Sequence, residues 1–154
     1  MGDPQKQPYE KALAEATGPT PNWREVLKLL RRAIKQGSYE ATYALATWHI
    51  FGKEPYVKKD IREAIRLLRI AASGGITEAL LDLGYSYEAG IGNRKNSKLA
   101  FEYYLKAAIR GNGQSIFEVG RLLWEGTGTE RNRRLANIWF DRAWELGTYN
   151  DGEE

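Results

Sequence analysis

Apolar side chains recur along most of the chain at the three- and four-residue spacing of one face of an α-helix. Each of two neighbouring segments places them on a single arc: Ala79, Leu80, Leu83, Gly84 and Tyr87 in the first, and Leu99, Ala100, Tyr103, Tyr104 and Ala107 in the second. Neither segment alternates apolar and polar residues as a half-buried strand does. The pattern therefore predicts an all-α protein.

The helical pattern repeats about every 36 residues. Six small residues recur 36 positions later: Gly84, Gly90, Gly92, Ala100, Ala107 and Gly111 are followed by Gly120, Gly126, Gly128, Ala136, Ala143 and Gly147. One unit earlier, the spacing is 38 before the loop 53–59 and 36 after it, so this loop carries a two-residue insertion. The repeat predicts eight helices arranged as hairpins, with a shortened first helix over 9–16 followed by a second over 23–36.

Capping residues and glycines predict where these helices begin and end. Asn22 with Glu25 and Asp60 with Glu63 have the spacing of a capping box. In that box the cap side chain accepts a backbone N–H bond and the glutamate reaches back to the cap. Glycines that can end a helix in the left-handed conformation follow the second helices at positions 37, 74, 111 and 147.

The motif of the central unit resembles the Sel-one-like repeat (SLR) family, a branch of the tetratricopeptide-like helical repeats. It reads Ala79-x-x-x-Leu83-Gly84-x-x-Tyr87-x-x-Gly90-x-Gly92, then Ala100-x-x-x-Tyr104-x-x-Ala107-Ala108-x-x-Gly111. The match covers about residues 22–147. Four residues depart from the motif: Ala46 replaces a glycine, His49 and Leu123 replace the tyrosine, and Trp144 replaces the second alanine.

The resemblance implies an α/α right-handed superhelical solenoid of about three and a half repeats, with a concave face that the family uses for scaffolding, adaptor and partner-recognition roles. We expect a single domain over residues 1–147. It would hold a partial repeat at 9–37 and repeats at 38–75, 76–111 and 112–147. Residues 148–154 would form a flexible acidic tail.

Composition places few limits on the partner. The 23 Lys and Arg against 20 Asp and Glu give a formal charge of +3, too small to require nucleic acid. Cysteine is absent, which fits a reducing compartment and excludes thiolate metal sites. No apolar run approaches the roughly 18 residues of a membrane span, and the first eight residues are polar. We therefore expect a cytoplasmic protein that does not associate with membranes.

The sequence contains no recognisable set of catalytic residues. His49 is the only histidine, and it occupies the packing position that Tyr87 fills one repeat later. No metal-binding motif is present, and the Gly-x-Gly pairs follow helices rather than the strands that dinucleotide loops require. We expect no catalytic residue, metal or cofactor. A hydrolase-type enzyme is the third choice of function, and its first support would be a pocket that joins His49 to carboxylates.

Basic residues gather in equivalent loops between the helices of each hairpin. We call this set the basic edge: Lys58, Lys59, Arg94, Lys95, Arg131, Arg133 and Arg134. One interpretation is a solvated surface. The other is that the basic edge steers an acidic partner, with a protein favoured over nucleic acid because no aromatic residues are interleaved for base stacking.

The first helices carry more apolar residues than a helical core needs. We expect a partner-binding stripe on them, made of Tyr43, Thr47, Ile50, Leu81, Tyr85, Glu88, Phe117, Arg121 and Trp124. Arg121 would offer hydrogen bonds to a carboxylate or backbone of the partner. The competing interpretation is that these side chains only thicken the core between helices.

These patterns favour a protein-interaction module that binds a protein partner on its concave face. The alternative is a cytosolic immunity protein that inhibits a bacterial toxin, because so small a repeat protein has no further domain to scaffold.

The last repeat carries three large rings in one helix, Trp139, Phe140 and Trp144. They either fold back as a cap, the arrangement we favour, or form a homodimer surface on the C-terminal repeat.

Overall fold

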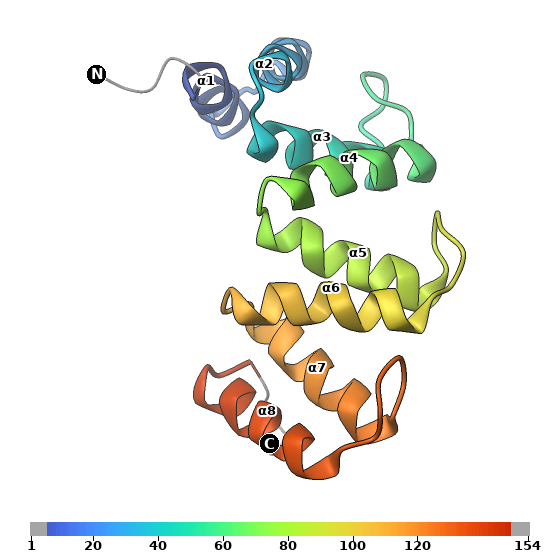
Figure 1. The fold of residues 1–154 in the computed structure, drawn as a ribbon. Coiled ribbons are helices and arrows are strands. Elements are labelled where there is room, and N and C mark those ends of the chain that lie inside the picture. Colours follow the sequence, from blue (N-terminus) through green and yellow to red (C-terminus); the bar gives the residue numbers. More distant parts are fainter. Residues whose placement is uncertain (1–5, 149–154) are drawn as a thin grey trace. The chain divides into compact units, whose positions relative to one another are not determined.

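A computed structural model describes residues 6–148, and these residues form eight α-helices (Figure 1). Their bounds are α1 (Gln7–Ala16), α2 (Trp23–Lys35), α3 (Tyr39–Phe51), α4 (Ile61–Ser73), α5 (Thr77–Ala89), α6 (Ser97–Ile109), α7 (Gly113–Glu125) and α8 (Arg133–Glu145). The described residues contain no strand beyond an isolated bridge between Lys53 and Val57. The predicted all-α repeat fold with eight helices is confirmed. The expected acidic tail lies outside the described residues, apart from Thr148.

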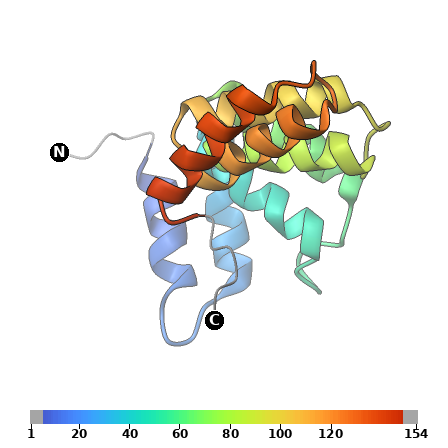
Figure 2. The ribbon, with the colours of Figure 1, turned by 90° about the horizontal axis from the view of Figure 1, so that it is seen from below.

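The helices form two compact units, one within residues 1–76 and one within 77–154. In each unit consecutive helices pack on one another, and α7 and α8 lie side by side in both views (Figures 1 and 2). The core of the first unit includes Ala12, Val26, Leu30, Ala33 and Ala41. The second has a larger cluster from α6, α7 and α8: Ala100, Tyr104, Ala108, Ile116, Val119, Leu122, Leu123, Ala136 and Ala143.

The predicted N-caps are present, but the reciprocal half of each capping box is not. Asn22 accepts the N–H of Glu25 at 3.2 Å, and Asp60 accepts the N–H of Glu63 at 3.0 Å. The backbone N–H groups of the caps find other acceptors: Asn22 donates to the Glu15 carboxylate and Asp60 donates to the carbonyl of His49. The prediction that each glutamate reaches back was therefore wrong, because another element already satisfies each cap.

One predicted helix-ending glycine has a different role. Gly75, not Gly74, takes the left-handed conformation after α4, with φ of 86°. Gly74 has φ of −84°, and a Cβ on it would lie 2.0 Å from the ring of Tyr39. It is therefore glycine because the ring packs against its backbone.

The glycines inside the first helices are explained by rings on the second helices. A Cβ on Gly84 would lie 2.6 Å from the ring of Tyr104, and one on Gly120 would lie 2.8 Å from the ring of Phe140. In the preceding repeat the equivalent pair is Ala46 and Leu68, both fully buried. A leucine leaves room for a methyl group where a ring does not. The departure of Ala46 from the repeat motif thus follows from the smaller side chain opposite it.

The three rings of α8 do not behave alike. Trp139 and Phe140 are partly buried and pack against the core of the second unit. Trp144 is 56% exposed. Two of the rings therefore cover the core as expected of a cap, while the third remains on the surface.

Candidate functional site

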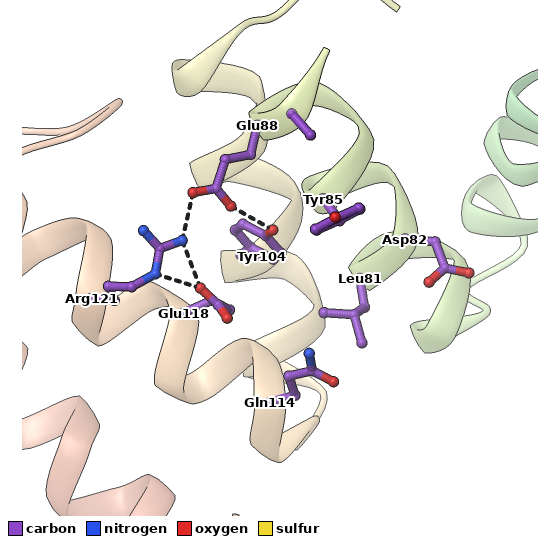
Figure 3. Close-up of a pocket in the computed structure, with 9 residues that line it drawn as sticks. Leu81, Asp82, Tyr85, Glu88, Tyr104, Gln114, Glu118 and Arg121 are labelled. Carbon is purple, nitrogen blue, oxygen red and sulfur yellow. Dashed lines mark hydrogen bonds and ion pairs between the residues drawn. The ribbon is translucent and has the colours of Figure 1, made fainter. Parts of the chain in front are cut away.

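A pocket of about 440 Å³ opens in the second unit, where α5, α6 and α7 meet. Its polar and charged lining comes from all three helices (Figure 3): Asp82, Tyr85 and Glu88 from α5, Tyr104 from α6, and Gln114, Glu118 and Arg121 from α7. Leu81 and Ala89 add apolar surface. The volume is within the range of sites that accept a side chain or a small ligand.

The guanidinium of Arg121 is held by three carboxylates. Its Nη2 lies 2.6 Å from Glu88 on α5 and 2.7 Å from Glu118 one turn earlier on α7, and its Nη1 lies 3.1 Å from Glu125. Nε donates a further bond to Glu118 at 2.8 Å. Burial alone would lower the pKa of Arg121, but the hydrogen bonds to Glu88 and Glu118 outweigh it and raise that pKa above its usual range. Arg121 therefore stays charged and fixes the carboxylates around it.

Tyr104 anchors the other oxygen of Glu88. Its hydroxyl donates to Oε2 of Glu88 at 2.8 Å, and its side chain is almost completely buried (Figure 3). Burial, followed by the hydrogen bond to Glu88, raises the pKa of Tyr104 well above its usual range. With one oxygen on Tyr104 and the other on Arg121, Glu88 has a single orientation.

The pocket combines negative charge with an open aromatic face. Three carboxylates and one guanidinium line it, so its formal charge is −2. The ring of Tyr85 is 60% exposed beside Leu81 in the same wall. Such a surface suits a group that carries positive charge on an apolar or flat body.

Four of the stripe residues in the second unit line this pocket: Leu81, Tyr85, Glu88 and Arg121. The other two do not. Phe117 packs against the core, with its ring centre 5.5 Å from that of Phe140. Trp124 is 41% exposed and lies under the guanidinium of Arg133, 4.8 Å from the ring centre.

The stripe residues of the first unit, Tyr43, Thr47 and Ile50, are half-buried on α3. The hydroxyl of Thr47 donates to the carbonyl of Ala44 at 2.7 Å, within its own helix. These three residues stay a prediction as partner contacts.

Four residues that line the pocket were not among those expected from the sequence: Asp82, Tyr104, Gln114 and Glu118. One signal was readable: Glu118 precedes Arg121 by three positions on a helix, the spacing of a side-chain ion pair. The bond between Glu88 and Arg121 joins equivalent faces of two successive first helices, and the repeat alone does not single it out. The sequence pattern predicts Tyr104 only as a core residue. In the structure its ring is buried, but its hydroxyl reaches the pocket.

The side chains of the basic edge are exposed, as expected of loop cations. Lys58 and Lys59 belong to the first unit, and the others flank the loops that follow α5 and α7. His49 is half-buried and lines a separate pocket in the first unit with one carboxylate, Asp60, which already caps α4. Nδ1 of His49 forms no hydrogen bond with Asp60 or any other described residue.

An all-α protein of repeated helical hairpins with a solvent-open charged pocket belongs to the class of helical repeat proteins. Residues 40–76, 77–112 and 113–148 each match the family model of the Sel1 repeat. The chain belongs to the Sel1 repeat family, and Sel1 repeats generally mediate protein–protein interaction. No helix of the described residues is both long and apolar enough to cross a membrane.

Similar proteins include both sequence relatives and solved structures. A chitin synthase regulator of Saccharomyces cerevisiae is 38% identical over 85 residues, 55% of this chain and only 12% of that protein. The crystal structure of a Sel1 repeat protein from Oxalobacter formigenes has a TM-score of 0.79 at 25% identity, covering 94% of this chain and 57% of that one. An immunity protein from Pseudomonas aeruginosa has a TM-score of 0.61 at 26% identity, covering 96% and 55%.

Proposed function

We propose that the chain is a protein-interaction module whose partner binds the exposed faces of the first helices, with the pocket between α5, α6 and α7 as its main anchor site. The observation that carries the proposal is the Tyr85 ring, 60% exposed beside a carboxylate fixed by Tyr104 and Arg121. Interfaces draw much of their binding energy from such aromatic anchors beside rigid polar groups.

The partner places a cationic side chain, Lys or Arg, in this pocket. The donors of Arg121 already point at Glu88, Glu118 and Glu125, so Arg121 orients the pocket instead of binding a partner carboxylate. The basic edge lies outside the pocket and contributes to steering an acidic region of the partner, which affects the association rate more than the affinity.

The experiment compares Tyr85→Ala with Ile138→Ala, a side chain of equal exposure (60%) on the second helix α8. A partner is first recovered with the wild-type chain from native cells, purified, and titrated calorimetrically against each variant. We expect Tyr85→Ala to weaken binding about 30-fold, equivalent to ~2 kcal/mol, and Ile138→Ala to change it less than about twofold. Equal effects of the two substitutions would remove the pocket from the interface.

A second candidate function is that of an immunity protein that neutralises a toxin. The likeness to the immunity protein from Pseudomonas aeruginosa favours it. The test is to express the product of the adjacent gene in a sensitive host, with and without this chain. Growth restored by the wild-type chain and not by Tyr85→Ala would support both the immunity function and the pocket. Failure of the wild-type chain to restore growth would contradict the immunity function and leave the proposal of a protein-interaction module with another partner.

Three further properties belong to the same proposal. We propose a cytoplasmic location, supported by the absence of cysteine. We propose that residues 1–147 form one domain, and the consecutive Sel1 matches support this for the part of the chain from residue 40 onward. Trp144, 56% exposed, is the candidate homodimer contact of the C-terminal repeat. Light scattering of the wild type against Trp144→Ala tests it, because a dimer held by Trp144 loses half its mass and a monomer keeps its 17.5 kDa.

A further inference from the structure

A second pocket, of about 410 Å³, lies in the first unit and has the opposite charge character. It is formed by α2, the end of α3 and the loop that joins α3 to α4. The polar residues that line it are Arg31, His49, Tyr56, Lys58, Lys59 and Asp60. The family assignment gives this pocket no role, and the proposed function uses only Lys58 and Lys59, as part of the basic edge that steers the partner.

The loop that builds the pocket is the one with the two-residue insertion. Its turn is closed by two backbone bonds between Lys53 and Val57, at 2.8 and 3.0 Å, and the side chain of Val57 is buried. The N–H of Asp60 then donates to the carbonyl of His49 at 2.9 Å, which ties the loop back to α3. Tyr56, Lys58 and Lys59 are therefore carried by a segment whose backbone is fixed at both ends.

The cations of this pocket have no carboxylate partner within residues 6–148. Arg31, Lys58 and Lys59 form no ion pair in that part of the chain, whereas Arg66, Arg121 and Arg142 do. The nearby carboxylates serve other groups. Asp60 accepts the N–H of Glu63, and Glu63 binds Arg66 at 2.6 Å. Hydrogen bonding to Arg66 lowers the pKa of Glu63, so this carboxylate stays ionised in its own pair.

Two further polar side chains complete the lining. Nδ1 of His49 is buried and has no hydrogen-bond partner. Tyr56 is half-buried and brings its hydroxyl to the lining. Buried polar atoms in folded proteins nearly always have a partner, and an unpaired one calls for an explanation such as a bound ion or water. The three cations and the Tyr56 hydroxyl supply the hydrogen-bond donors of this site.

We infer that this pocket binds a phosphate group. Three cations and one carboxylate give the lining a formal charge of +2, which matches a phosphate dianion. The fork of the Arg31 guanidinium and the ammonium groups of Lys58 and Lys59 can donate to several oxygens at once. A carboxylate has only two oxygens and one charge and would leave donors unused. The phosphate is either free in solution or carried by a phosphorylated hydroxyl compound.

The only histidine of the chain is a built-in reporter for this site. Inorganic phosphate is titrated into the full chain at constant pH and ionic strength, with sodium chloride as the balancing salt. The carbon-bound imidazole protons of His49 are followed by NMR. We expect a saturable shift of these signals. Arg31→Gln should weaken the apparent affinity about tenfold, the loss that follows from removing one charge-assisted hydrogen bond.

Matched controls come from the next repeat. Arg94 and Lys95 occupy the positions equivalent to Lys58 and Lys59. Lys58→Gln with Lys59→Gln should weaken phosphate binding at least as much as Arg31→Gln, whereas Arg94→Gln with Lys95→Gln should leave it within about twofold. All the substituted side chains are exposed, so each variant should remain folded. A shift that does not saturate, or equal weakening by both double variants, would overturn the inference.

Two further ligands define the source of the phosphate. O-phosphoserine that binds more tightly than inorganic phosphate would support a phosphate carried on a larger ligand, and equal affinity would support free phosphate. Acetate that shifts His49 with the same affinity as phosphate would overturn the assignment, because a single carboxylate would then satisfy the site. None of these results depends on the pocket between α5, α6 and α7.

Discussion

The hydroxyl of Tyr104 donates to Glu88 at 2.8 Å, which connects the core of the second unit to the charged wall of its pocket. The ring of Tyr104 fills the space opposite Gly84, and its hydroxyl holds the carboxylate that binds Arg121. One side chain therefore determines both how closely α5 and α6 pack and how Glu88 is oriented. A change at Tyr104 should be felt in stability and at the surface together.

Removing only the hydroxyl separates these two effects. We expect Tyr104→Phe to lower the free energy of unfolding by about 1 kcal/mol, because the ring stays and one hydrogen bond to a partly exposed carboxylate is lost. Urea denaturation measures this. Tyr85→Phe is the matched control, since its ring is exposed, and it should change stability by less than about 0.5 kcal/mol. Equal losses in both variants would mean that the bond to Glu88 contributes nothing specific.

The same hydroxyl predicts a dependence of stability on alkaline pH. The pKa of Tyr104 is raised by burial and by Glu88 above the ordinary value of 10.0, so above that pH the unfolded chain releases a proton that the folded chain keeps. The contribution of Tyr104 is therefore complete below pH 10.0 and falls as the pH rises beyond it, by up to about 1.4 kcal/mol per pH unit. Tyr104→Phe lacks this loss, so the stability difference between wild type and variant should shrink above pH 10.0. A difference that stays constant or widens there would contradict the assignment.

The close approach of Gly84 to the Tyr104 ring predicts energetic coupling. Gly84→Ala alone should destabilise the chain by about 1–3 kcal/mol, because its Cβ would lie 2.6 Å from the ring. Tyr104→Leu alone should also destabilise it by leaving a cavity. The double variant recreates the Ala46 and Leu68 pair of the preceding repeat, and it should lose at least ~1 kcal/mol less than the sum. Strict additivity in a double-mutant cycle measured by urea denaturation would show that ring and glycine do not constrain each other.

The repeat period predicted the helices well because it depends on small residues where helices cross or end. The same small residues recur at the same positions in each repeat, so one sequence is enough to reveal them. Ala100 and Ala107 recur as Ala136 and Ala143, and all four are fully buried. The capping boxes were only half correct, because the partner of an N–H group can come from a distant element, as Glu15 does for Asn22. The capping-box pattern covers only four consecutive residues, so it could not predict an acceptor on another element.

The candidate site was predictable to a lesser degree. Leu81, Tyr85, Glu88 and Arg121 were predicted from surplus apolar residues and helical spacing on one face of the first helices, and all four line the pocket. The chemistry assigned to Arg121 differs, because its donors are engaged by Glu88, 33 residues away, and by two neighbours on α7. Ion pairs between successive repeats depend on the packing of helices, which one sequence does not specify.

The last prediction concerns the division between core and surface within the predicted stripe. Phe117 contacts Phe140 and packs against the buried cluster of the second unit, whereas Tyr85 is 60% exposed in the pocket wall. We expect Phe117→Ala to lower the free energy of unfolding by about 3 kcal/mol, as for a large core side chain, and Tyr85→Ala to lower it by less than about 0.5 kcal/mol. Leu83→Ala, fully buried on the same helix as Tyr85, is the positive control and should lose about 2–5 kcal/mol.

Binding to the recovered partner should show the reverse order. Phe117→Ala should retain affinity at temperatures where it stays folded, while Tyr85→Ala should lose most of it without a change in melting midpoint. A large drop in stability for Tyr85→Ala with affinity intact would place Tyr85 in the core, and the stripe would then serve only to pack the helices. Loss of both stability and affinity in Phe117→Ala alone would instead move the interface from the pocket to the α7 and α8 side of the second unit, where Phe117 meets Phe140.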